Sequence, residues 1–354
     1  MLTPFNNSNF SGAHDWTGVY KAVSWIQLIM AALSVVGSSS IIVCLLLQRL
    51  SQKPELQPLF QLSVADLLLA VCWVIGGALF FQHCNNLNTL CYNLHTVEQI
   101  LYMASFFCTL NYVWNLFTGI REKYHSCFTG YSVQFSNRIS TAAKMVSLFS
   151  FVFPALLMTP VFIQGNLSRC QVNLSEPYRC LLMHTGALYL TSAQQLSTPC
   201  HLLHDYQIIV FLSTFVLTLL SITLLVVKAR RIYRRVVTSS GYLGNEQRSL
   251  FQVLDRRMVL YPLIFFLCWG PAVALAFLRV VKPSAGHGKM AVVLYICQAL
   301  TSASQGFFNC LVYGWIRLHL RRAGPTVLSR DVDTRTPLLS PQQNRSYQSL
   351  RTMS

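Results

Sequence analysis

The sequence predicts an all-α polytopic membrane protein, a seven-transmembrane-helix bundle with a short interfacial helix after the seventh span. Of its 354 residues, 53% are hydrophobic and only 11% are charged, whereas soluble globular proteins carry roughly 25% charged residues. The apolar residues also gather in stretches of about 20, the length that crosses a hydrocarbon core. Seven such stretches occur, at residues 22–47, 58–82, 94–120, 144–164, 206–228, 258–281 and 290–316.

The remaining segments flank a single membrane domain. We expect residues 1–21 to form an extracellular glycosylated N-terminus, residues 22–322 the seven-helix domain, and residues 323–354, which are rich in Ser, Arg, Pro and Gln, a disordered cytoplasmic tail. Residues 315–322, just before this tail, interleave arginines with apolar side chains, which favours a short helix on the inner leaflet. No internal repeat is visible, so the inverted-repeat architecture of many transporters has no support.

The basic residues orient the chain. With the N-terminus outside, most of the 27 Lys and Arg residues fall on inner segments, as the positive-inside rule requires. The net charge of +16 is then a topology signal, and no basic stretch lies on a soluble domain as nucleic-acid binding would require. We therefore expect a multi-pass protein of the plasma membrane or endosomes, with membrane lipid as a partner and the C-terminus in the cytoplasm.

Glycosylation acceptors give an independent orientation signal, because Asn-x-Ser/Thr is modified only on the lumenal side. Asn6, Asn9, Asn166 and Asn173 fall on segments predicted to lie outside, and only Asn344 falls inside, where it should stay bare.

Five cysteines also lie on predicted outer segments, where disulfides persist: Cys84, Cys91, Cys170, Cys180 and Cys200. Five cannot all pair internally. We expect Cys91 to bridge to the long outer loop through either Cys170 or Cys180. No CxxC or Cys/His spacing suggests a metal site, and no cofactor is expected.

Polar residues interrupt three of the apolar stretches. Asp66 lies in the middle of QLSVADLLLA, residues 61–70, where a carboxylate costs about 2.5–3.5 kcal/mol on insertion scales. Such groups are expensive to leave unpaired in lipid and should therefore face the interior of the bundle. The other polar residues that interrupt these stretches are Glu98, Asn111, Asn115, Gln305 and Asn309.

Three motifs resemble those of seven-helix G-protein-coupled receptors. LSVADLLLA, residues 62–70, is similar to the rhodopsin-like L-x-x-A-D-L pattern, and FFLCWGP, residues 265–271, matches F-x-x-C-W-x-P. QGFFNCLVYG, residues 305–314, resembles a run found in cyclic-AMP-receptor-like and related families, with Cys310 in place of the rhodopsin-like proline. The end of the third stretch departs from the family, because Ile120 precedes Arg121 where the family has an acid.

The resemblance implies a hydrated polar network that can switch between two arrangements. Its members would be Asp66, Asn111, Ser302, Gln305 and Asn309. The alternative for Asp66 is a protonated packing residue that is hydrogen-bonded to serines.

The same resemblance assigns a moving part to the sixth helix. Trp269 and Pro271 would supply the rotamer and the kink that let its inner half swing, and Tyr313 would close the network near the cytoplasmic end. The alternative for Trp269 is an ordinary buried aromatic residue.

A ligand pocket would lie in the outer half of the bundle, with His95 and Glu98 as candidate ligand-binding residues. Glu98 could meet a cationic ligand or pair with Arg279. On the inner side, a heterotrimeric G protein would meet Arg121, Arg231, Arg234 and Arg256, although the positive-inside rule demands such arginines in any membrane protein.

The sequence therefore favours an orphan receptor that passes the signal of an unknown extracellular ligand to a G protein. The alternatives are a membrane scaffold or trafficking protein and, with less support, a transporter. In the tail, YQSL places Tyr347 and Leu350 in a Y-x-x-Φ pattern that endocytic adaptor proteins read. No cluster of catalytic residues is visible, so no enzymatic activity is expected.

Overall fold

The computed structural model describes residues 17–48, 56–81, 88–129, 138–170, 180–182, 198–238, 245–281 and 289–322. These residues form helices and short connections, with no strand among them. The helices are α1 (Thr17–Leu47), α2 (Gln57–Phe80), α3 (Asn88–Thr129), α4 (Arg138–Leu167), α5 (Thr198–Thr238), α6 (Asn245–Val281), α7 (Lys289–Thr301) and α8 (Gln305–Arg322).

Seven segments are long and apolar enough to cross a membrane. Helices α1 to α6 each supply one, and the seventh runs from α7 into α8, over Met290–Leu318. The all-α seven-helix bundle predicted from composition is therefore confirmed. Large apolar side chains such as Leu47, Val36 and Leu217 are exposed on its outside, as a lipid-facing surface requires.

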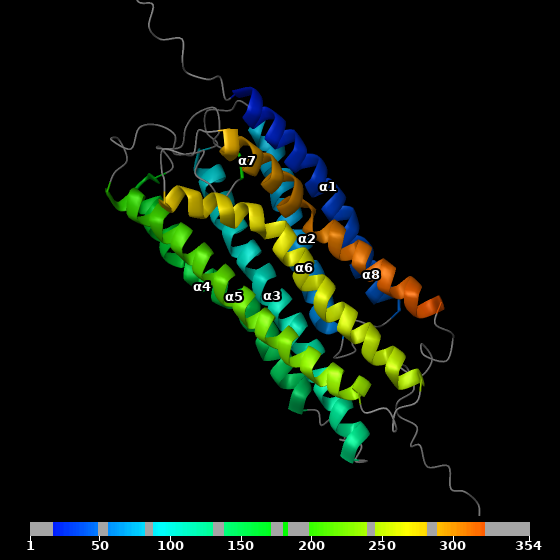
Figure 1. The fold of residues 1–354 in the computed structure, drawn as a ribbon. Helices are drawn as coiled ribbons and strands as arrows, with labels where there is room; N and C mark the ends of the chain where they lie inside the picture. Colours follow the sequence, from blue (N-terminus) through cyan, green and yellow to red (C-terminus); the bar gives the residue numbers. More distant parts are fainter. Residues whose placement is uncertain are drawn as a thin grey trace, which may run out of the picture.

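Helix α3 occupies the centre of the bundle. It packs against α2, α4, α5 and α6, and 61% of its apolar window is buried, compared with 28% for α4. Figure 1 shows α1 beside α2 and α8 on one side and α4 beside α5 on the other. Side chains on α3 can therefore reach most of the other helices.

The two ends of the bundle differ chemically. At the end where α3 begins, Cys91 is bonded to Cys180, and Cys170 is bonded to Cys200; we call this the disulfide end. The opposite end, where α5 leaves the bundle with residues 228–235, is the basic end. Of the two partners expected for Cys91, the structure selects Cys180, whereas Cys170 bridges the end of α4 to the start of α5.

The seventh span is broken in its middle, which the sequence analysis does not predict. Residues Ser302–Ser304 form a 3-10 turn between α7 and α8. Ser302 Oγ donates to the Gln298 carbonyl at 2.6 Å, and Ser304 Oγ donates to the Thr301 carbonyl at 2.9 Å. Such bonds to nearby carbonyls bend helices.

Small residues let α8 approach α1 closely below this break. A Cβ atom on Gly37 would lie 2.8 Å from Phe307 Cα, so no larger residue fits there without moving a backbone. The Gly306 N–H donates to Ser34 Oγ at 3.0 Å. Helices α1 and α8 therefore run side by side in direct contact (Figure 1).

The short interfacial helix predicted after the seventh span does not exist as a separate element. Residues 315–322 continue α8 to Arg322. No proline interrupts the backbone ladder, and the contacts of Tyr313 and Arg317 with Cys44 Sγ keep this part of α8 along α1.

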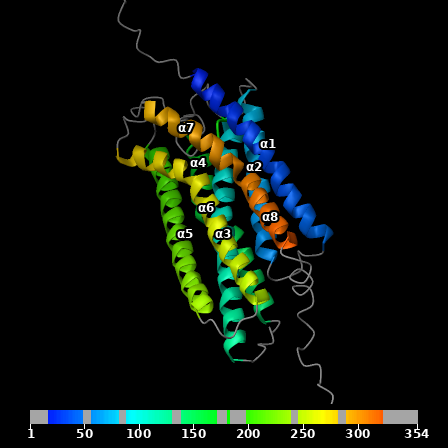
Figure 2. The ribbon, with the colours of Figure 1, turned by 45° about the vertical axis from the view of Figure 1, so that its right-hand side comes forward.

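Helix α6 is bent, as Figures 1 and 2 show. It contains Pro262 and Pro271 in its interior, and a proline within a helix removes a backbone hydrogen bond and clashes with the preceding turn. The bend turns the last part of α6 across the disulfide end.

Candidate functional site

Asp66 stands in the middle of α2, is 3% exposed, and accepts hydrogen bonds from two other helices. Its Oδ1 accepts from Ser105 Oγ of α3 at 2.8 Å and from Gln305 Nε2 of α8 at 2.9 Å. Its Oδ2 accepts from Asn309 Nδ2 at 2.8 Å. Gln305 and Asn309 can both reach Asp66 because residues four apart share one helix face. One carboxylate thus joins three helices.

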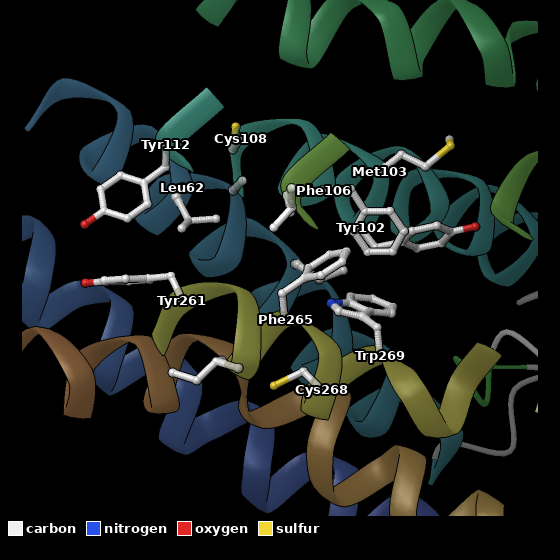
Figure 3. Close-up of a cluster of buried hydrophobic side chains, with 14 of the residues drawn as sticks. Leu62, Tyr102, Met103, Phe106, Cys108, Tyr112, Tyr261, Phe265, Cys268 and Trp269 are labelled. Carbon is white, nitrogen blue, oxygen red and sulfur yellow. The ribbon is translucent and has the colours of Figure 1, made fainter. Parts of the chain in front are cut away.

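Trp269 adds α6 to this group. Its indole N–H donates to Gln305 Oε1, so Gln305 bridges the tryptophan and the carboxylate. The ring packs against Phe106 at 4.8 Å and Tyr102 at 5.5 Å between centroids. Figure 3 shows these aromatic rings gathered around Trp269. We call Asp66, Ser105, Trp269, Gln305 and Asn309 the central network.

A second buried carboxylate, Glu98, lies nearer the disulfide end and is 4% exposed. Its Oε1 accepts from Trp73 Nε1 of α2 at 2.7 Å, and its Oε2 lies 3.4 Å from His95 Nδ1. Trp73 follows Asp66 by seven residues and Glu98 precedes Ser105 by seven, which is the register that two antiparallel helices require. The Trp73 and Trp269 rings lie 6.4 Å apart, so the two carboxylates are linked through two indoles.

Polar atoms around Glu98 are incompletely bonded. Two buried atoms close to Glu98 in the sequence, His95 Nε2 and Gln99 Oε1, have no hydrogen-bond partner among the described residues. By contrast, both oxygens of Asp66 and both polar atoms of the Gln305 amide are bonded. Buried polar groups are normally paired, so the surroundings of Glu98 can accept further donors.

The segment after the Cys91–Cys180 disulfide is packed into the bundle. Leu182 is 2% exposed, and its carbonyl accepts from Gln27 Nε2 of α1 at 2.7 Å. Its side chain occupies the space beside Gly76, where a Cβ atom would lie 2.4 Å from Leu182 Cδ1. Residues 180–182 therefore form a fixed wall next to the helical turn that carries Trp73.

Toward the basic end, a pair of tyrosines joins α3 to α6. The Tyr112 and Tyr261 rings lie 4.7 Å apart, and both side chains are almost fully buried. Figure 3 shows their hydroxyl groups on the same side of the cluster. Farther along α3, Ile120 is buried and Arg121 is exposed, so the residue at the position where G-protein-coupled receptors carry an acid packs into the core.

Three residues expected in the central network make other contacts. Asn111 Oδ1 accepts from Asn115 Nδ2 of the same helix at 2.8 Å. Ser302 Oγ bonds within its own turn, and Tyr313 OH lies 4.0 Å from Cys44 Sγ. No hydrogen bond of the described residues joins any of them to Asp66, because each finds a partner closer to its own backbone or on α1. Pro271 lies half-buried in α6.

The arginines expected to face a G protein have different surroundings. Arg121, Arg231 and Arg234 are exposed, whereas the Arg256 guanidinium lies 5.6 Å from the centre of the Trp315 ring. The side chain of Arg279, the alternative partner of Glu98, is outside the described part of the chain.

Of the four predicted glycosylation sites, only Asn166 lies among the described residues. It is half-buried in the last turn of α4, and its Nδ2 donates to Asn93 Oδ1 at 3.0 Å and to the Phe162 carbonyl at 2.8 Å. A glycan on Nδ2 would replace one of these hydrogen bonds. The remaining predicted residues lie outside the described part of the chain. They are Cys84, the sequons at Asn6, Asn9 and Asn173, and the tail signal at Tyr347 and Leu350.

Sequence reasoning missed Ser105 and Trp73. A serine in an apolar helix usually bonds to its own backbone, as Ser63 does to the Leu59 carbonyl at 2.9 Å, so its type alone carried no signal. The positions of the two residues did carry a signal. Trp73 lies seven residues after Asp66 and Ser105 lies seven residues after Glu98, so each shares a helix face with a carboxylate.

A comparison with protein families bears on the whole membrane region. The family model for "Transmembrane protein 116" matches residues 20–349, which cover all the described helices beyond the first turn of α1. Transmembrane protein 116 is also the relative that the divergent motifs favour, and this match confirms that prediction. The chain therefore belongs to the transmembrane protein 116 family.

Proposed function

We propose that this protein is a receptor of the G-protein-coupled type, which passes an extracellular ligand signal to a cytoplasmic heterotrimeric G protein. The observation that carries the proposal is the central network, since Trp269 of α6 reaches Asp66 of α2 through Gln305. A displacement of α6 relative to α2 must break or exchange these buried bonds. An element with two discrete bonded arrangements is what a switch needs.

In this proposal the ligand enters from the disulfide end and binds near Glu98. The unpartnered atoms His95 Nε2 and Gln99 Oε1 can bond to a ligand that carries hydrogen-bond donors. Trp73 bonds to Glu98 and also contacts the Trp269 ring. A ligand that changes the Glu98–Trp73 contact would therefore act directly on the residue that holds α6.

The Tyr112–Tyr261 pair supports an output step at the basic end. It holds α6 against α3, whereas an Asp–Arg pair at the end of α3 is ruled out by Ile120. We assign to the two tyrosines the closing contact that opens when α6 moves. The two side chains also share a hydrogen bond, so Tyr261→Phe, which keeps the ring and removes the hydroxyl, should raise basal signalling.

The test is guanine-nucleotide exchange on a panel of G proteins, with the wild type beside Asp66→Asn and Trp269→Ala. Ser63→Ala is the matched control, because Ser63 lies three residues from Asp66 on α2 and its hydroxyl bonds to the Leu59 carbonyl of its own helix. We expect exchange that the first two changes alter and the control leaves intact. Equal effects of all three variants would contradict a role for the central network.

A scaffold or trafficking protein without signalling is the second candidate. The buried Ile120 beside an exposed Arg121 favours it, because the receptor family's inner lock is absent. Normal surface expression with no exchange on any G protein in the panel would support the scaffold and reject the receptor.

The orientation within this proposal has its own test. With the disulfide end outside, glycosidase treatment should shift the electrophoretic band through Asn6, Asn9 or Asn173. A glycan at Asn344 would show that the orientation is the opposite of the one proposed.

A further inference from the structure

Helix α5 exposes one continuous apolar stripe along its membrane-spanning part. Leu217, Leu220 and Leu224 are 64%, 57% and 62% exposed, and their spacing of three and four residues places them on one face. The opposite face packs into the core, where Ile222 and Leu225 are buried. Figure 2 shows α5 at an edge of the bundle. The stripe therefore faces the acyl chains of the membrane.

Basic residues continue this stripe at the basic end. Lys228 and Arg231 follow Leu224 by four and seven residues and are exposed, so they stand on the same face as the leucines. Ala229, between them in sequence, is 1% exposed and packs into the core. The two cations thus point along the lipid-facing side of α5 and not toward the interior of the bundle.

No acidic side chain of the described residues pairs with Lys228 or Arg231. The ion pairs of His95 with Glu98 and of His201 with Asp205 lie on other parts of the bundle. Clusters of four to eight basic residues beside a membrane span attract anionic lipid headgroups. Residues 228–235 hold five: Lys228, Arg230, Arg231, Arg234 and Arg235.

We propose that Lys228 and Arg231 bind the phosphate of an anionic phospholipid whose acyl chains lie against Leu220 and Leu224. A guanidinium binds phosphate oxygens in a bidentate manner and an ammonium adds a point charge. The apolar stripe places the lipid where these groups reach its headgroup. The surface needs no receptor activity and is independent of the proposed function.

The chain supplies a matched control. Arg230 is exposed and carries the same charge as Arg231, but one residue rotates the side chain by about 100° around the helix axis, so Arg230 lies off the stripe. If the stripe binds the lipid, Arg231→Gln and Arg230→Gln must differ. If only the charge of the segment matters, they must agree.

The experiment is native mass spectrometry of the full chain in detergent, titrated with phosphatidylserine or with phosphatidylcholine. We expect preferential binding of phosphatidylserine. Lys228→Gln and Arg231→Gln should each lower the affinity for this lipid roughly fivefold, whereas Arg230→Gln should lower it less than twofold. The variant Lys228→Arg should bind like the wild type. Thermal unfolding of each variant checks that the bundle is intact.

Three results would overturn the proposal. One is an equal loss for Arg230→Gln and Arg231→Gln, which assigns the effect to net charge. Another is equal affinity for a soluble inositol phosphate and for the lipid, which makes the site a phosphate site that does not need the stripe. The third is unchanged lipid binding in Lys228→Gln/Arg231→Gln, which shows that these two charges do not hold the headgroup.

Discussion

The two buried carboxylates of this bundle are almost equally hidden from solvent, yet they are bonded in different ways. Asp66 accepts from Ser105, Gln305 and Asn309, which belong to two other helices. Glu98 accepts from Trp73 of one other helix, and its second contact is His95 of its own helix. Asp66 therefore ties α2 to α3 and α8, whereas Glu98 ties α3 to α2 alone.

The polar neighbours of Asp66 are also more completely hydrogen-bonded than those of Glu98. The Gln305 amide beside Asp66 is fully bonded, while His95 Nε2 and Gln99 Oε1 beside Glu98 have no partner among the described residues. A closed set of bonds resists change, and an open set can gain bonds from a ligand. Under the proposed function, this difference favours Glu98 as the group that meets the ligand and Asp66 as the group whose bonds must be exchanged for α6 to move.

The largest effect should follow from Asp66→Ala. The substitution leaves Ser105 and Asn309 without their acceptor and leaves Gln305 Nε2 with Ser105 Oγ alone, and each buried unsatisfied donor costs about 1–3 kcal/mol. We expect a loss of about 3 kcal/mol or more in the free energy of unfolding, measured by thermal or SDS denaturation in micelles.

Ser63→Ala is the control for Asp66→Ala, because Ser63 lies three residues away on α2, is equally buried, and bonds only to the Leu59 carbonyl. Similar losses in the two variants would show that Asp66 does not cross-link the helices.

A smaller effect should follow from Gly37→Ala, which changes neither carboxylate and acts on the partners of Asp66 through α8. The new methyl group would meet the Phe307 backbone and push α8 from α1, together with Gln305 and Asn309. Overpacking of this kind costs roughly 1–3 kcal/mol. Thermal unfolding should show this loss, and Trp73→Phe should cost the same stability in Gly37→Ala as in the wild type, because the Trp73–Glu98 contact joins α2 to α3.

Gly314→Ala separates a lost contact from a change in helix propensity. No atom lies within 4 Å of a Cβ at Gly314, so alanine there should stabilise α8 by about 0.5–1 kcal/mol. A loss of stability in Gly314→Ala would undermine the contact argument for Gly37.

Much of this arrangement was predictable from sequence because hydrocarbon imposes simple rules. Apolar length fixed the seven spans, and the cost of an unpaired carboxylate turned Asp66 inward, toward the Gln305 and Asn309 face. Ser105 and Trp73 were not found, because serine and tryptophan are common in apolar helices for other reasons. The 3-10 turn at Ser302–Ser304 depends on several weak side-chain hydrogen bonds together, so no single residue type predicts it.

Tryptophan-to-phenylalanine changes should have a modest effect and compare the two carboxylates directly. Trp269→Phe removes the donor to Gln305 Oε1, and Trp73→Phe removes the donor to Glu98 Oε1. A net hydrogen bond contributes about 1 kcal/mol, so each variant should lose about that much stability.

A double-mutant cycle tests whether the Trp269 contact is specific. Trp269→Phe should couple to Gln305→Leu by about 0.5 kcal/mol or more, while Trp73→Phe should be additive with Gln305→Leu. Coupling of Trp73 to Gln305 would mean that the two carboxylates form one unit.

The smallest effect should follow from Glu98→Gln. The new side chain keeps an oxygen that accepts from Trp73, and its amide group faces His95 Nδ1. Because His95 Nε2 has no partner among the described residues, the ring can place its proton there and accept at Nδ1 without losing a bond. We expect a loss of only about 0.5 kcal/mol in unfolding free energy, within the range of an ordinary hydrogen bond. Asp66→Asn should lose clearly more, because its new amide group requires the Asn309 amide to turn over or the Ser105 hydroxyl to accept instead of donate. Equal losses for Glu98→Gln and Asp66→Asn in the same denaturation assay would mean that the disulfide end is as closed as the centre, and would remove the argument for a ligand there.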